Sequence, residues 1–139
     1  MLNIPECSPS LALRIIATGV ALPPGKIMSS DLDLRLGKPA GYVEKRSGIE
    51  YRYHAEENAS QAELAAVALH DAVDQCGIDH RSIDLVISAS AISHQALPCT
   101  AIHIIKAAKL APTTAGFEIN SSCVSFISAM QVATGLLNA

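Results

Sequence analysis

Four stretches of the chain have the hydrophobic pattern of β-strands. They run from Leu13 to Leu22, from Ile49 to His54, from Asp84 to Ile92 and from Gly116 to Ile119. The first is a mostly apolar run that Pro23-Pro24-Gly25 ends, as is typical of a short buried strand before a turn. The second alternates apolar and polar positions, and the third is a run of apolar and small residues. We expect the third to be a central strand that is covered on both faces.

Three longer helices are predicted, over 60–76, over 99–110 and from Cys123 onward. Ser60 and Glu63 fit a capping box at the start of the first helix, and Gly77 suits a left-handed end. Pro98 suits the first turn of the second helix, and the third carries no charged residue. Shorter helical segments are expected over 31–36, with Ser30 as the cap and Gly37 as the end, and over 42–46.

The order of these elements, in which strands and helices alternate, predicts an α/β fold. It implies a mostly parallel sheet with helices on both faces, joined by right-handed crossovers. Half of the 139 residues are hydrophobic but only 4% are aromatic, so the apolar mass consists of aliphatic side chains that suit helix-on-sheet packing. We expect a loose amino-terminal extension over 1–12 and one domain over 13–139.

Charge and cysteine spacing argue against several classes of function. The net charge is −3 and the basic residues are scattered, so we expect no nucleic-acid partner. No stretch reaches the ~20 apolar residues of a membrane helix, and the start lacks a signal-peptide pattern, so we expect a cytoplasmic protein with no membrane association. The four cysteines form no CxxC pair and have no zinc-binding spacing, so neither a metal site nor a disulfide framework is expected.

Cys123 stands where the last strand passes through small polar residues into the charge-free helix. Backbone N–H groups at a helix start point toward such a thiol, and the helix dipole favours the thiolate. Ser121 and Ser122 leave room for a substrate carbonyl to approach, and ligands bind at the carboxyl ends of parallel strands. The junction therefore predicts a nucleophile.

Each cysteine also has another interpretation. Cys123 is flanked by Val, Phe and Ile, and on pattern alone this favours packing as a small apolar side chain. Cys99 is a rival nucleophile because it follows Pro98 at a helix start, but no buried strand and small-residue turn precede it. Cys76 lies on the packed face of its helix and Cys7 lies in the extension, so we expect both to be structural or incidental.

Five segments occur in the order and spacing of a known family. They are ATGVALP (17–23), YVEKRSGIEYRYHA (42–55), the helix over 60–76, LVISASAISHQALP (85–98) and FEINSSCVSF (117–126). With them the chain, from about residue 13 to its end, resembles the amino-terminal half of β-ketoacyl-acyl-carrier-protein synthase III. The resemblance implies the thiolase-like fold of a condensing enzyme.

The resemblance also implies an activity and a set of site residues. Cys123 would take the acyl group from an acyl-CoA before decarboxylative condensation with malonyl-acyl carrier protein, in fatty-acid or related biosynthesis. Both thioesters are substrates, and no cofactor is implied. Arg46 matches an arginine near the mouth of the coenzyme A tunnel, or it is a surface charge or cap. Tyr42 falls where bacterial members have a tryptophan that stacks on the adenine. Leu97 replaces an aromatic residue that closes the acyl pocket across the dimer, or it is a core or interface leucine.

The family completes a Cys-His-Asn site with residues of a second half, and this sequence ends before that half. The histidines of this sequence are His54, His70, His80, His94 and His103, and none of them matches the catalytic histidine of the family. The resemblance therefore implies an acyltransferase that is incomplete in this chain and inactive alone, with the missing half and a second copy, in a homodimer, as partners. Independently, a charge-free helix after Cys123 should be buried on every side.

Three other interpretations remain open at this point. An enzyme of secondary metabolism could use the same cysteine for acyl transfer without elongating fatty acids. A non-catalytic fragment could only dimerise. A thiol-redox protein is disfavoured because no CxxC pair is present.

Overall fold

The computed structural model describes residues 13–93 and 95–137. In chain order its elements are β1 (Gly25–Met28), α1 (Ser29–Arg35), α2 (Tyr42–Ser47), β2 (Tyr51–His54), α3 (Gln61–Cys76), the 3₁₀ turn η1 (His80–Ser82), β3 (Leu85–Ala89), α4 (Thr100–Ala107), β4 (Ala115–Ile119), the 3₁₀ turn η2 (Ser122–Val124) and α5 (Ser125–Leu136). The described residues do not include the extension expected over 1–12, in which Cys7 lies, or His94.

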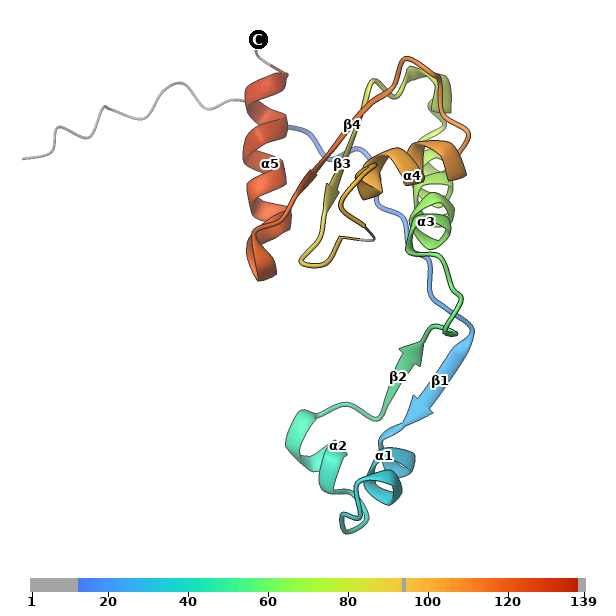
Figure 1. Cartoon of the computed structure of the whole chain (residues 1–139), viewed down its shortest axis with the longest axis vertical. Coiled ribbons are helices and arrows are strands. Elements are labelled where there is room, and N and C mark those ends of the chain that lie inside the picture. The colour runs from blue at the N-terminus through green and yellow to red at the C-terminus, as the bar shows by residue number, and fades with distance from the viewer. Residues whose placement is uncertain (1–12, 94, 138–139) are drawn as a thin grey trace, which may run out of the picture.

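The body of the molecule is built on a parallel pair of strands. β3 and β4 pair in a register that runs from Leu85 beside Ala115 to Ala89 beside Ile119. α5 packs on one face of the pair, and α4, with α3 behind it, packs on the other (Figure 1). Small apolar side chains fill the space between α3, α4 and the sheet, with Ala66, Ala108 and Leu110 buried at its centre. The predicted arrangement of a parallel sheet with helices on both faces is confirmed.

A second part, formed by β1, α1, α2 and β2, projects from this body (Figure 1). β1 and β2 pair antiparallel, so this sheet differs from the parallel one in the body. Asp33 is buried and joins the two short helices, because Oδ2 accepts the Gly41 N–H at 2.7 Å and Oδ1 accepts the Val43 N–H at 2.8 Å. The carboxylate thereby satisfies free backbone donors at the start of α2.

Several predicted elements occur where the sequence places them. α3 begins after Ser60, whose Oγ accepts the Glu63 N–H at 3.3 Å, and it ends at Gly77 with φ of +68°. The helix predicted over 42–46 and the strand predicted over 49–54 are present as α2 and β2. Pro98 lies just outside α4, because Cys99 occupies the cap position and the helix begins at Thr100.

The predicted strand from Leu13 to Leu22 is wrong. This segment runs against α3: the Val20 N–H donates to Asp71 Oδ2 at 2.9 Å, and Gly19 lies against the backbone of Ala68. The Val20 N–H, followed by the side chain of Gln75, holds the pKa of Asp71 below its ordinary value. Within the described residues β3 and β4 pair only with each other, so the segment has no strand partner.

Two local signals at the start of the chain lead to wrong predictions. The sequence predicts a turn at Pro23-Pro24-Gly25, whereas β1 begins at Gly25, because β2 offers it a partner. Ser30 is not the cap of α1, since the helix already begins at Ser29 and Met28 holds the cap position. The Ser29 hydroxyl is buried and donates to the Ile49 carbonyl, which connects the start of α1 to the segment just before β2.

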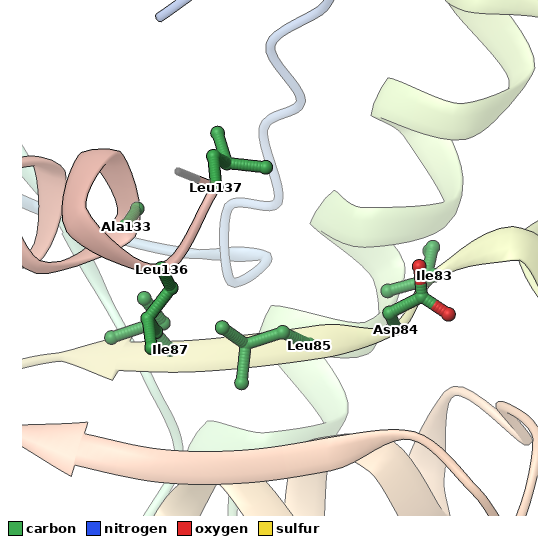
Figure 2. A pocket seen from close by; sticks show the side chains of 7 residues that line it. All are labelled: Ile83, Asp84, Leu85, Ile87, Ala133, Leu136 and Leu137. Carbon is green, nitrogen blue, oxygen red and sulfur yellow. The ribbon is translucent and has the colours of Figure 1, made fainter. Parts of the chain in front are cut away.

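The outer side of α5 is uncovered in this chain, whereas its lack of charge predicts a helix that is buried on every side. Phe126 is 60% exposed and Leu137 is 71% exposed. At its carboxyl end α5 forms an apolar groove of about 510 Å³ with the start of β3. Ile83, Asp84, Leu85, Ile87, Ala133, Leu136 and Leu137 line it, and Leu136 lies over Ile87 (Figure 2). No helix in the described residues is long and apolar enough to cross a membrane.

Candidate functional site

The carboxyl ends of β3 and β4 lie at one edge of the sheet, because the two strands are parallel. The segment between β3 and α4 and the turn between β4 and α5 both begin at this edge (Figure 1). Backbone and side-chain bonds hold them together: the Ser90 N–H donates to the Ile119 carbonyl at 3.3 Å, and Asn120 Nδ2 donates to the Ala91 carbonyl at 3.0 Å. This edge is where open α/β sheets bind ligands.

Cys123 lies in the turn at this edge, with its side chain exposed. The helix predicted to start at Cys123 begins at Ser125, and Cys123 occupies the middle of η2. Ser122 has φ of +52°, and the Val124 N–H donates to the Ser121 carbonyl at 3.2 Å, which closes the turn. The thiol therefore stands just before the amino-terminal end of α5 and is open to a reactant.

The other two described cysteines have different surroundings. Cys99 is half-buried at the start of α4, and its Sγ lies 4.0 Å from the Gly116 carbonyl oxygen. Cys76 is half-buried in the last turn of α3, where its Sγ donates to the Val73 carbonyl at 3.5 Å. Of the cysteines that the structure describes, Cys123 alone is exposed. Its exposure contradicts the interpretation that it packs as a core side chain in this chain.

The other predicted site residues fall in two places. Tyr42 and Arg46 lie one turn apart on α2, where Arg46 Nη1 donates to the Tyr42 hydroxyl at 3.3 Å and the guanidinium carbon is 5.9 Å from the ring centroid. Leu97 belongs to the segment between β3 and α4 and is 86% exposed. The fold thus places Leu97 in the segment bonded to the turn of Cys123, whereas Tyr42 and Arg46 lie in the projecting part (Figure 1).

Two polar residues near this edge were not predicted from the sequence. Glu118 lies on β4, and a hydrogen bond from the Thr100 hydroxyl, opposed by partial burial, holds the pKa of its carboxyl below the ordinary value. Its signal was a charge inside an otherwise apolar strand. Ser125 is 3% exposed at the start of α5, where the sequence shows one more serine in a serine-rich turn.

The described histidines lie on β2, α3, η1 and α4, and none is in the turn of Cys123. They are His54, His70, His80 and His103. Within residues 13–93 and 95–137, no group of three or more His, Cys, Asp or Glu side chains is arranged to hold a metal ion.

Comparisons with known proteins give the class of the fold. 3-Oxoacyl-[acyl-carrier-protein] synthase III from Aquifex aeolicus matches with a TM-score of 0.80 and 27% identity, over 88% of this chain and 39% of that one. OleA from Xanthomonas campestris matches with a TM-score of 0.78 and 21% identity, over 88% of this chain and 38% of that one. The chain has the thiolase-like α/β fold that its motifs imply.

Sequence comparisons then show which enzymes of this fold the chain resembles. No protein-family model matches the chain. It is 30% identical over 124 residues to β-ketoacyl-[acyl-carrier-protein] synthase III from Neisseria meningitidis serogroup B, and 30% identical over 125 residues to the protein of that name from Rhodospirillum rubrum. The chain spans 39% of the length of each of these relatives, as an amino-terminal half would. The resemblance to synthase III is confirmed.

Proposed function

We propose that this chain supplies the nucleophile of a β-ketoacyl-acyl-carrier-protein synthase III-type condensing enzyme, and that Cys123 is that nucleophile. The observation that carries the proposal is the exposed thiol of Cys123 at the carboxyl edge of the parallel strands, between β4 and α5. Similarity to the synthases over 89% of the chain supports it.

The chemistry consists of two acyl transfers. The Cys123 thiolate attacks the carbonyl of an acyl-CoA, and the tetrahedral intermediate collapses to an acyl-Cys123 thioester with release of the coenzyme A thiolate. Malonyl-acyl carrier protein then loses carbon dioxide, and the resulting carbanion attacks the acyl-Cys123 carbonyl. The β-ketoacyl group leaves on the carrier protein, and the Cys123 thiolate is restored.

These steps also need acid–base and oxyanion groups. A tetrahedral oxyanion and a carbanion both need preorganised donors, and the turn around Cys123 contains no histidine. We therefore expect a complementary half of the enzyme to supply them. This chain alone would accept the acyl group slowly and would not complete the condensation.

Arg46, Tyr42 and Leu97 have roles in substrate binding in this proposal. Within the described part of the chain, no carboxylate forms an ion pair with the guanidinium of Arg46, which can therefore face the phosphates of coenzyme A. The exposed Tyr42 ring beside it can stack on the adenine. Leu97 would close the acyl pocket from a second copy of the chain.

A complementary half and a second copy would also cover apolar surface. The outer side of α5 and the groove beside Leu136 and Leu137 are open in this chain (Figure 2). Burying large aliphatic and aromatic side chains stabilises an assembly by about 1.5 to 3 kcal/mol for each one fully buried. These surfaces support an enzyme that is assembled from more than this chain.

Acylation of the chain by an acyl-CoA tests the proposal. We expect intact-mass measurement to show one added acyl group that neutral hydroxylamine removes, and peptide mapping to locate it on Cys123. Cys123→Ser should abolish the adduct and Cys99→Ser should retain it. No acylation, or acylation centred on Cys99, would show that Cys123 is not the nucleophile and would favour a non-catalytic dimerising fragment.

A further inference from the structure

The hydroxyl of Ser125 lies inside the turn that carries Cys123. Ser125 Oγ accepts the Ser121 N–H at 2.9 Å and donates to the Ser122 carbonyl at 2.8 Å. The side chain is 3% exposed, so both bonds are shielded from water. One buried hydroxyl therefore links the two residues that come directly before Cys123 to the first residue of α5.

The turn needs such support because its backbone is strained. Ser122 has φ of +52°, a left-handed conformation that is unfavourable for a residue with a Cβ atom. A second bond acts on the same residue, since the Ser122 N–H donates to Asn120 Oδ1 at 3.4 Å. Strained backbone persists where the surroundings hold it, and in this turn the bonds converge on the residue before the thiol.

Position on the helix does not by itself give a side chain this role. Thr134 lies further along α5, and its hydroxyl donates back to the Met130 carbonyl at 2.7 Å, within the helix. Ser128 lies one turn after Ser125 and is half-buried. Ser125 differs from Thr134 because its hydroxyl reaches out of the helix into the turn of Cys123.

We propose that Ser125 is a positioning residue for Cys123. Its hydroxyl holds the turn 121–124, in which Ser122 is left-handed, and so presents the thiol at the carboxyl edge of β3 and β4. Ser125 is buried and its hydroxyl bonds backbone groups of the turn, so it acts through the backbone. This inference rests on the proposed function, because an acyl transfer needs the thiol in one orientation toward a bound carbonyl.

Two reagents that differ in how strictly they require one orientation of the thiol test this inference. Iodoacetamide is small and free in solution, so it alkylates an exposed thiol in many orientations, whereas transfer from an acyl-CoA needs one. In Ser125→Ala we expect acylation of Cys123 to slow about tenfold, because a reacting group that leaves its productive geometry reacts more slowly. Alkylation of Cys123 by iodoacetamide should stay within about twofold of wild type, because the thiol remains exposed.

The matched control is Ser128→Ala, which removes a hydroxyl one turn further along the same helix. We expect it to leave both rates unchanged. Thermal unfolding shows whether each variant is folded. If Ser125→Ala does not fold, both rates are compared between Ser122→Gly and Ser122→Gly/Ser125→Ala. Glycine reaches the positive φ without strain but can also leave it, so in this background the bonds of Ser125 are what fixes the turn.

The outcomes separate this inference from the proposed function. If wild-type Cys123 is acylated and folded Ser125→Ala acylates at the wild-type rate, or the double variant acylates as fast as Ser122→Gly, Ser125 does not position the thiol. An equal loss of both rates would likewise overturn the inference, because it would indicate general disruption of the turn. If wild-type Cys123 is not acylated at all, the proposed function itself fails.

Discussion

Lys109 has a backbone conformation that is unfavourable for a residue with a Cβ atom. It follows α4 with φ of +54°, and the Leu110 N–H donates to the Ile105 carbonyl across it at 3.1 Å, so the helix ends in a left-handed turn that glycine would fit better. We expect Lys109→Gly to raise the free energy of unfolding by about 1 kcal/mol in chemical denaturation.

The control for this prediction is Lys106→Gly, in the last turn of α4. Glycine inside a helix should lower the free energy of unfolding by about 1 kcal/mol. If both substitutions destabilise the protein equally, the left-handed strain at Lys109 is not a real cost.

Glu118 should make stability depend on pH. The Thr100 hydroxyl donates a hydrogen bond to its carboxylate and, against the effect of burial, lowers its pKa in the folded protein. The ionised group therefore stabilises the fold above the unfolded pKa of about 4.3, and this contribution is lost as the pH falls through the lower folded pKa. Urea unfolding from neutral to acid pH should show wild type losing more stability than Glu118→Gln. Parallel curves for the two proteins would contradict this.

At the scale of elements, we expect alanine at two glycine positions to change stability in opposite directions. A Cβ atom at Gly19 would collide with the Ala68 carbonyl of α3, whereas a Cβ at Gly135 on α5 would meet no atom within 4 Å. We expect Gly19→Ala to cost about 1 to 3 kcal/mol of unfolding free energy through overpacking. Gly135→Ala should instead stabilise α5 by up to about 1 kcal/mol. Thermal and urea unfolding would measure both, and a neutral Gly19→Ala would show that the segment 13–22 does not pack on α3.

The same segment shows where sequence reasoning ends. α3 was predictable because its signals are local: Ser60 caps it, Gly77 ends it, and apolar residues repeat between them. A strand needs a partner, and the apolar run from Leu13 to Leu22 has none among the described residues. The hydrophobic pattern indicated how strongly this segment prefers burial, but it could not show which backbone it would meet.

The site was predictable to the same extent. Cys123 could be found because a thiol after small residues at a strand end is a local pattern with a chemical meaning. Ser125 could not, because its importance comes from the two backbone groups that its hydroxyl joins, and one serine in a row of serines gives no such signal. The lowered pKa of Glu118 could not be predicted either, because it depends on a hydrogen bond from Thr100, which is distant in sequence.

At the scale of the whole molecule, the uncovered side of α5 should drive association. Phe126 and Ile127 are exposed there, and the apolar groove near Leu137 adds to this surface. We expect light scattering over a dilution series to show association that weakens in Phe126→Ser/Ile127→Ser.

Leu34 provides the control, because it is 81% exposed on α1 in the projecting part. Leu34→Ser should leave association unchanged. A chain that stays monomeric at high concentration, or an equal effect of Leu34→Ser, would show that α5 is not the surface that associates.

The central claim is that Cys123 is the thiol to which coenzyme A delivers an acyl group. Haloacetyl-coenzyme A tests it most directly, since this reagent alkylates a thiol beside the place where coenzyme A binds. We predict that it labels Cys123 ahead of Cys99 and Cys76, and that excess coenzyme A, but not an unrelated nucleotide, protects Cys123. Labelling that follows only the exposure of each thiol, unaffected by coenzyme A, or labelling that favours Cys99, would contradict the account.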